Sequence, residues 1–330
     1  MSTRPNPPAA AAAGSRDPAG PGGTADSPAP RTDRRRGRRP RVVRGTLVTT
    51  YSHWFYVPAG VIYAVVFVVP TLISFYFAFT RWDLFSSQWI GLDNFRQFFS
   101  EQSLRSSLRN TLVYAVLTSG LKVVIGMMLA VLLTAPLRSR GFLRSVVFFP
   151  VLVSTVAVGV TFQMILAPEF GLVSNVFATF GATTPDFLGQ AGTALLSVAA
   201  VDVWKGVGLA TVIYIAGILS IPRDYYEAVE VDGGGAWTKF RNITLPLAKP
   251  ATFTVVLLSF IGGLRSFDLI WTMTGGGPGF SSDVIASVIY KQYQAGFYGL
   301  ATAGNVVLFL LVTGIVYPLF WWINRQEVDL

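Results

Sequence analysis

Six apolar stretches, each about long enough to cross a lipid bilayer, constrain this chain more than any other feature. They cover approximately residues 55–79, 110–135, 144–167, 191–221, 250–274 and 295–323. A helix needs about 20 apolar residues to cross the hydrocarbon core. Because lipid offers the backbone no hydrogen-bonding partner, such stretches fold as helices. The sequence therefore predicts an all-α, polytopic membrane protein with six transmembrane helices.

The first 45 residues differ in composition from the rest of the chain. They are rich in Ala, Pro, Gly and Arg and show no apolar periodicity. Such a segment cannot bury enough surface to offset the entropy of ordering. We predict a disordered, basic, cytoplasmic tail over 1–45 and one membrane domain over 46–330 that contains all six spans.

Basic residues indicate the orientation, because cytoplasmic loops carry an excess of Lys and Arg. With the amino terminus inside, the cytoplasmic loops and the carboxyl end hold eight basic residues and the outer loops hold five, before the ten arginines of the tail are counted. Both termini are therefore expected in the cytoplasm. The arginine-rich run before the first span is expected to contact anionic membrane lipid rather than nucleic acid.

Composition also excludes several kinds of chemistry. Without cysteine the chain can form neither disulfides nor thiolate metal sites, and the single histidine, His53, offers a metal no partner. No metal site is therefore predicted. None of the five lysines follows the glycine-rich pattern of a phosphate-binding loop. The chain is thus not expected to be an enzyme, and ATP-driven work would require a separate ATPase.

The segment 220–246, between the fourth and fifth apolar stretches, is the most informative part of the chain. Pro222 suits the first turn of a short helix, acidic residues follow it, and the glycines at 233–235 end it. A second short helix is predicted from about Ala236, with Trp237 on its apolar face. Two short helices joined by a glycine elbow would form a knob on the cytoplasmic surface, which favours docking to a partner.

The ordered residues of this segment resemble the EAA loop of ATP-binding-cassette (ABC) import permeases. The members of the motif are Glu227, Ala228, Asp232, Gly233, Phe240, Ile243, Leu245 and Pro246. The runs Gly91–Phe95 and Thr274–Pro278 are similar to those of the carbohydrate branch, in particular the maltose-type first permease. The chain departs from the usual pattern in three places, with Val229 and Gly234 in place of alanine and an additional charge at Glu230.

The resemblance implies the type I ABC importer permease fold and a bacterial cell (inner) membrane location. It also implies that the chain forms half of a translocation pathway for a sugar or related polyol. The implied partners are a second homologous permease, an extracellular solute-binding protein and two ABC ATPase subunits, which would bind ATP with Mg. In that family the EAA loop docks into the ATPase, and this chain would need no cofactor of its own.

Ionisable residues inside apolar stretches are costly, and they usually face a partner or a pathway. The fourth stretch holds Asp202 and Lys205, and the fifth holds Arg265 and Asp268, so each pair is spaced to meet on neighbouring helical turns. These residues are expected either to neutralise each other or to contact substrate. Lys122, in the second stretch, is expected to snorkel or to be paired.

The fifth stretch also carries a stripe of small residues, Ser259, Gly263 and Ser266, at i, i+4 and i+7. Such a stripe suits close helix packing or an aqueous path. The resemblance to the maltose-type permease implies a substrate pathway that contains these three residues together with Thr155, Asp202, Lys205 and Gly206.

Two other functions compete with the import permease. A secondary transporter would be driven by an ion gradient and often shows internal repeats, which are not evident here. An intramembrane enzyme would have only carboxylate chemistry available, at Asp202 or Asp268. Transport by the isolated chain, or only with an ATPase and ATP, would distinguish the three.

Overall fold

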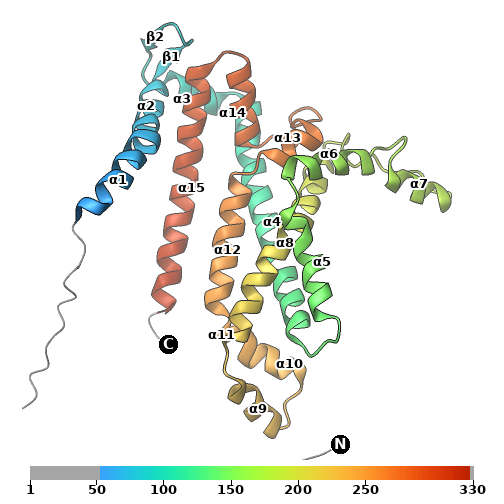
Figure 1. The fold of residues 1–330 in the computed structure, drawn as a ribbon. Coiled ribbons are helices and arrows are strands. Elements are labelled where there is room, and N and C mark those ends of the chain that lie inside the picture. The colour runs from blue at the N-terminus through green and yellow to red at the C-terminus, as the bar shows by residue number, and fades with distance from the viewer. Residues whose placement is uncertain (1–52, 328–330) are drawn as a thin grey trace, which may run out of the picture. The chain divides into compact units, whose positions relative to one another are not determined.

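A computed structural model describes residues 53–327, and these residues are mostly helical (Figure 1). The predicted tail at 1–45 lies outside the described residues. The body of the structure is the unit that begins at Tyr56. In it, the short helices α9 and α10 lie at one end and a two-stranded hairpin, β1 and β2, lies at the other. We call these the α9 end and the hairpin end.

Four runs of helix are long and apolar enough to cross a membrane. The first, Trp54–Phe77, contains α1 (Val57–Tyr63), a π-helical turn η2 (Ala64–Val68) and α2 (Val69–Phe77). The other three are single helices, α4 (Gln102–Thr134), α8 (Ala194–Leu219) and α15 (Tyr298–Glu327). These four confirm the first, second, fourth and sixth predicted spans as helices.

The third predicted span is not one helix. It consists of α5 (Arg140–Leu152) and α6 (Thr155–Ile165), which meet at an angle of 98°. Helix α5 ends at Leu152, two residues after Pro150, and Val153 is extended, with φ −79° and ψ 141°. With 13 residues, α5 is about 20 Å long, short of the roughly 30 Å hydrocarbon core.

The fifth predicted span, 250–274, is also interrupted. Helix α12 (Lys249–Leu264) ends before Arg265, and α13 (Asp268–Thr274) begins after a short break. At its other end α12 meets the run Ala236–Leu247 at 67°. The structure therefore supports four to six spans, and the number reaches six when each bent pair is taken as one span.

Small residues allow the central helices to approach closely. A Cβ atom added at Gly126 on α4 would lie 2.9 Å from Cβ of Ala210 on α8. One added at Gly263 on α12 would lie 2.7 Å from Cα of Ala115 on α4. Such close contact between backbones is typical of membrane helices, where packing replaces the hydrophobic effect. Helix α4 is therefore packed against both α8 and α12.

The connection between α2 and α4, at the hairpin end, contains short elements. Strands β1 (Thr80–Trp82) and β2 (Ser87–Trp89) pair antiparallel, and α3 (Asp93–Ser100) follows them. The buried amide of Asn94 donates to the carbonyl oxygens of Ala78 and Thr80, at 2.9 Å each. These bonds attach α3 to the hairpin. The remaining helices are α7 (Leu172–Thr179), α9 (Arg223–Val231), α10 (Ala236–Lys239), α11 (Leu245–Leu247) and α14 (Ile285–Gln294), with a π-helical turn η3 (Phe240–Thr244).

Candidate functional site

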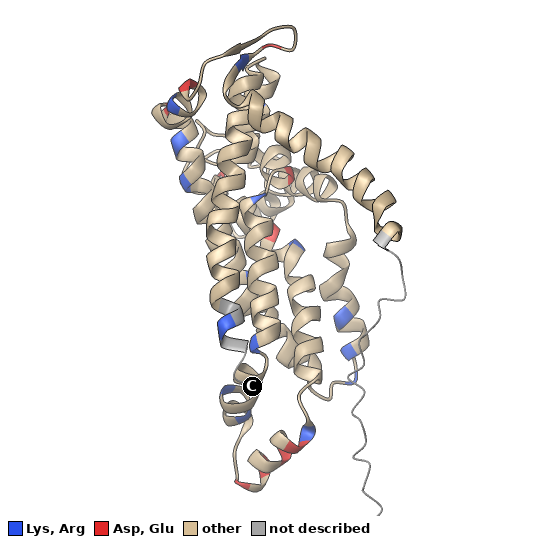
Figure 2. Ribbon diagram, turned by 90° about the vertical axis from the view of Figure 1, so that its left-hand side faces the viewer, with Lys and Arg blue, Asp and Glu red and all other residues tan. Residues whose placement is uncertain are grey.

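The segment 220–246 forms the predicted pair of short helices at the α9 end (Figure 1). Helix α9 begins directly after Pro222 and ends at Val231. Gly233 then adopts φ +75°, a left-handed conformation that side chains disfavour. The prediction that glycine ends the helix here is confirmed. Figure 2 shows residues of both charge signs on this segment.

Two side-chain contacts hold the knob together. The hydroxyls of Tyr226 on α9 and Thr244 in η3 are 3.1 Å apart and share a hydrogen bond. Lys239 at the end of α10 forms an ion pair with Glu230 on α9. Glu230, which is one of the departures from the family pattern, therefore joins the two helices across the elbow.

The other two departures, Val229 and Gly234, are in contact, and the small residue at 234 leaves space for the large one at 229. The backbone N–H of Gly234 donates to the carbonyl oxygen of Val229 at 2.8 Å. A Cβ atom at 234 would collide with Cγ1 of Val229 and lie 3.0 Å from its carbonyl oxygen. Valine at 229 thus requires glycine at 234, because only glycine leaves room for the valine methyl group.

The surface of the knob presents both motif residues and large apolar side chains. Glu227, Ala228, Asp232 and Gly233 are exposed, whereas Phe240 and Pro246 are half-buried. Three exposed apolar residues lie beside the motif, Tyr225, Val231 and Trp237, with exposed fractions of 52%, 88% and 69%. An exposed apolar patch with a polar rim is typical of a protein interaction site.

A second group of polar residues lies within the helix bundle. Nζ of Lys122 on α4 is 2.8 Å from Oδ2 of Asp202 on α8. Their side chains are only 9% and 19% exposed. The prediction that Lys122 is paired is therefore confirmed, and its partner comes from 80 residues further along the chain.

Glycine makes this ion pair possible. A Cβ atom at Gly206, one turn beyond Asp202, would lie 2.7 Å from Cε of Lys122. The lysine stem therefore lies against the bare backbone of α8. A small cavity of about 110 Å³ adjoins it, lined in part by Lys122, Gly206, Ser259 and Gly262. Four of the lining positions are thus polar or glycine, and two of them, Gly206 and Ser259, belong to the predicted pathway.

A buried tyrosine, which the sequence analysis did not identify, faces the same region. The hydroxyl of Tyr114 on α4 is buried and has no hydrogen-bond partner among the described residues. The side chains of Asp202 and Ser266 both lie near that hydroxyl. Ser266 and Asp202 were both predicted as pathway residues, in different apolar stretches. In the structure both lie near the Tyr114 hydroxyl. Its position four residues before Thr118 and eight before Lys122 is the sequence signal that could have indicated it.

The predicted pairing within each helix is wrong for Asp202, which pairs with Lys122 instead of Lys205. Within residues 53–327, Lys205 forms no ion pair and is half-exposed. Arg265 and Asp268 are both exposed and form no ion pair with each other. Because the helix breaks between Leu264 and Asp268, the i, i+3 geometry of a continuous helix does not apply to them.

Two further predicted pathway residues have separate positions. Gly263 is buried in the contact with Ala115, which is a packing role. Thr155 is half-buried at the first residue of α6, and its side chain makes no hydrogen bond in the described part of the chain. The structure therefore brings together Asp202, Gly206, Ser259 and Ser266 around Lys122 and Tyr114, but gives Thr155 no polar contact with them.

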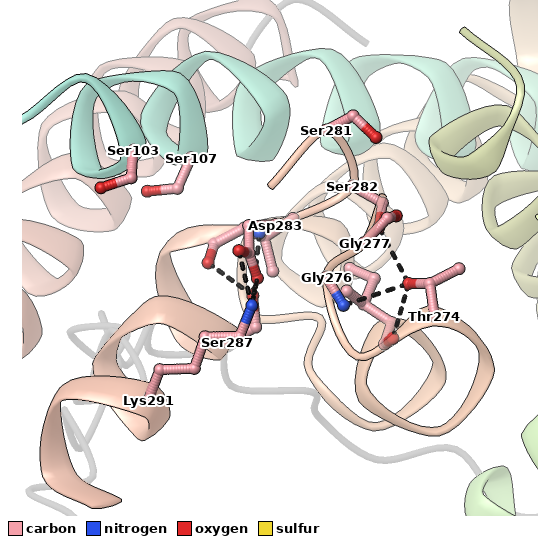
Figure 3. A network of polar contacts seen from close by, with 12 residues as sticks. Ser103, Ser107, Thr274, Gly276, Gly277, Ser281, Ser282, Asp283, Ser287 and Lys291 are labelled. Atoms are coloured by element: carbon pink, nitrogen blue, oxygen red, sulfur yellow. Dashed lines mark hydrogen bonds and ion pairs between the residues drawn. The ribbon is translucent and has the colours of Figure 1, made fainter. Parts of the chain in front are cut away.

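A third polar network fixes the loop between α13 and α14 (Figure 3). Asp283 is fully buried, and Nζ of Lys291 lies 2.9 and 2.7 Å from its two carboxylate oxygens. The hydroxyl of Ser287 also donates to Asp283, at 2.8 Å. The amide of Asn110 on α4 donates to the carbonyl oxygens of Ser281 and Asp283. These contacts attach the loop and the start of α14 to α4.

Comparison with known proteins places these features in a family. Residues 122–321 match the family described as "Binding-protein-dependent transport system inner membrane component". The trehalose/maltose transport system permease protein MalF of Thermococcus litoralis is 30% identical over 264 residues, which cover 79% of this chain and 90% of that protein.

Solved structures show the same fold. The structure of a bacterial ABC transporter involved in the import of the acidic polysaccharide alginate matches with a TM-score of 0.75 and 24% identity, covering 82% of this chain and 94% of that one. The alginate transporter in complex with an alginate pentasaccharide-bound periplasmic protein matches with a TM-score of 0.73 and 24% identity, covering 83% and 94%.

Proposed function

Because this chain belongs to the family of binding-protein-dependent transport system inner membrane components, we propose that it is a permease subunit of an ATP-driven sugar or polyol importer. It forms half of the translocation pathway, and a second homologous permease forms the other half. Two ABC ATPase subunits supply the energy by binding ATP with Mg, and an extracellular binding protein delivers the substrate. A relative that carries trehalose and maltose by name supports the substrate class.

The observation that carries this proposal is the exposed knob at 220–246. Its motif residues Glu227, Ala228, Asp232 and Gly233 face solvent beside a patch of large apolar side chains. A stable chain that exposes such a patch has a partner for it. We therefore assign the knob to the docking of an ATPase subunit. Phe240 and Pro246, which are half-buried, would hold the exposed part of the knob against the rest of the structure.

The knob is also connected to the pathway mechanically. Thr244 and Ala248, where the knob meets α12, are 5% and 1% exposed and so are anchored in the bundle. Helix α12 begins at Lys249 and carries Ser259 and Gly263. Because packed helices transmit displacement rather than absorb it, a movement of the knob would shift α12 against α4 and α8.

The polar group around Lys122 and Asp202 provides the substrate-facing side of the proposed pathway. An ion pair and a serine hydroxyl can both exchange hydrogen bonds with the hydroxyls of a sugar. Lys205 adds a half-exposed cation on the same helix as Asp202. Large apolar side chains around the site are exposed, among them Trp204, Leu209 and Leu258, and we assign this face to contact with the second permease.

Orientation follows from the docking role. If the knob meets a cytoplasmic ATPase, the α9 end is cytoplasmic and the hairpin end is extracytoplasmic. The bias of basic residues supports the same orientation, with both termini inside a multi-pass protein of the bacterial inner membrane.

Reconstitution into proteoliposomes tests the proposal. Uptake of substrate should require the partner ATPase, ATP and the binding protein, and the permease alone should transport nothing. Glu227→Arg or Gly233→Val should leave a membrane-inserted permease that fails to retain the ATPase during purification or to stimulate ATP hydrolysis. Gly235→Ala is a matched control, because its φ of −80° and the open space around it tolerate a side chain.

The conservative variant Glu227→Gln tests whether the charge of Glu227 takes part in docking. Because Glu227 lies beyond the first turn of α9, where Asp224 is the acidic residue, the loss of its charge should affect the helix itself little, and transport should persist if the charge is not needed for docking. Full ATPase retention and stimulation in Glu227→Arg and Gly233→Val would contradict the docking role.

A further inference from the structure

An aromatic cleft lies toward the hairpin end, between β1, α14 and α15. Its volume is about 390 Å³, within the range of small-ligand sites. Its lining includes Trp82, Phe267, Tyr290, Tyr293, Tyr298 and Asn305. Five aromatic rings from four segments of the chain therefore line one concave surface.

The rings form two packed groups. Tyr290 packs edge-on against Phe267 and Trp271, with ring centroids 5.3 and 4.8 Å apart. Tyr298 packs against Trp82 and Tyr293, at 5.7 and 5.1 Å. Edge-to-face packing fixes each ring at a defined angle. Tyr290 and Tyr293 still expose 37% and 56% of their surface, so part of each remains available to a ligand.

The cleft also contains a polar group suited to hydroxyls. Asn305 on α15 is exposed, and its amide makes no hydrogen bond to any described residue. An amide offers both donors and an acceptor, so it can bind a vicinal pair of hydroxyls. Aromatic anchors at a membrane interface lie at the level of the lipid headgroups, whereas here the rings line a hollow together with this amide.

One wall of the cleft is held rigidly before any ligand arrives. Lys291, which directly follows Tyr290, binds the buried carboxylate of Asp283 through both of its oxygens (Figure 3). Ser287, one turn earlier, binds the same carboxylate. These bonds join α14 to the loop before it, and Asn110 on α4 binds the backbone of that loop, so a ligand would lose little free energy in ordering this wall.

The cleft adjoins the polar group inside the bundle. Phe267 in its lining directly follows Ser266, and Ser266 lies near the Tyr114 hydroxyl beside Asp202. The cleft and the proposed pathway therefore contain neighbouring residues of one segment, Phe267 and Ser266.

We propose that this cleft binds a pyranose ring of the substrate before it enters the pathway. The C–H face of a pyranose carries partial positive charge and suits the negative face of an aromatic ring, while its hydroxyls suit the Asn305 amide. The site differs from the ion-pair region around Lys122 in both position and chemistry. This inference rests on the proposed function, because only a sugar carrier would present such a ligand here.

Binding of maltotriose to the assembled transporter in lipid nanodiscs tests the inference. Maltotriose is an adequate probe because ring stacking recognises pyranosides in general, and sn-glycerol 3-phosphate, which has no ring, is the contrasting probe. We expect a saturable change in tryptophan fluorescence with maltotriose and none with glycerol 3-phosphate. Trp82→Phe should reduce the amplitude of that change.

Paired variants separate ring stacking from a structural role. Tyr290→Leu and Tyr298→Leu should weaken maltotriose binding by about tenfold, whereas Tyr290→Phe, which keeps the ring, should stay within about twofold. Tyr317→Leu is a matched control, because this tyrosine of α15 is 68% exposed and lies outside the cleft.

ATP hydrolysis stimulated by the binding protein, measured on the same nanodiscs, reports the proposed function separately. Stimulated hydrolysis without saturable maltotriose binding, or equal binding by the Leu and Phe variants, would overturn the cleft proposal alone. A lipid chain in the cleft would produce the first of these results. Loss of stimulation in the unmodified transporter would instead count against the proposed function, whatever the maltotriose result.

Discussion

The carboxylate of Asp202 on α8 accepts a hydrogen bond from the ammonium of Lys122 on α4, at 2.8 Å. Gly206 creates the space for this contact, because the lysine stem lies where a side chain at 206 would be. Two charges inside a bundle of apolar helices are therefore neutralised between helices. The pair links two helices of the pathway that we propose.

Removing one partner of this ion pair should destabilise the permease strongly. Lys122→Met or Asp202→Asn leaves a buried charge unpaired, and the expected cost is about 3–5 kcal/mol. The double variant Lys122→Met with Asp202→Leu should regain most of the thermal stability but not the transport activity. Thermal unfolding of the purified protein and uptake in proteoliposomes measure the two effects.

Lys205→Met provides the control for that series. Lys205 is on the same helix but forms no ion pair among the described residues, so its loss should change stability by less than about 1 kcal/mol. A double variant no more stable than the single ones would show that the pair is not the source of the loss.

Substitution by alanine should destabilise the protein at Gly263 but not at Gly262. A Cβ atom at Gly263 would lie 2.7 Å from the backbone of Ala115, whereas nothing lies within 4 Å of one at Gly262. Gly263→Ala should therefore cost about 1–3 kcal/mol through overpacking, and Gly262→Ala should be tolerated. The yield of monodisperse protein on size-exclusion chromatography, with its melting temperature, gives the comparison.

Ser266→Leu should act on transport rather than on folding. Ser266 is half-buried near the Tyr114 hydroxyl and is not part of the Gly263 contact. We expect uptake to fall while the melting temperature and ATPase retention stay close to those of the unmodified protein. Normal uptake in this variant would remove Ser266 from the pathway.

Val229 and Gly234 should show strong coupling in a double-mutant cycle. Gly234→Ala alone should distort the knob, because the added methyl group collides with the side chain of Val229. Adding Val229→Ala removes that collision and restores the alanine common in the family at both positions. Co-purification of the ATPase should fall in the single variant and recover in the double one, and independent effects would contradict the compensation.

Reporter fusions test the orientation. Fusions at Gly181, which follows α7, and at Gly296, between α14 and α15, should behave as extracytoplasmic, and a fusion at Gly235 should behave as cytoplasmic. All three glycines lie in connections between helices where no side chain is displaced. Cytoplasmic activity at Gly181 or Gly296 would reverse the orientation that we propose.

Local features of the sequence were sufficient for much of the knob and of the membrane helices. The turn at Gly233 was predictable because only glycine adopts a left-handed conformation at low cost, and the structure confirms φ +75° there. The long helices α4, α8 and α15 were predictable because each contains an unbroken apolar run, and the length of such a run can be compared directly with the thickness of the bilayer. The breaks at Val153 and Arg265 were not, because both lie in runs whose composition alone still favours a membrane span.

Contacts between distant parts of the chain depended on the tertiary structure. Spacing along one helix suggested that Asp202 would meet Lys205, but the close packing at Gly126 and Gly206 brings Lys122 to it from another helix. The sequence alone determined that this chain has apolar helices long enough to cross a membrane and two short helices joined by glycine at 220–246, because those properties depend on local composition and order. Tertiary structure alone decided which charges are paired, that Tyr114 lies beside them and that five aromatic rings share one cleft. The residues involved are far apart in the sequence, and the packing of the helices, which no local pattern predicts, sets the distances between them.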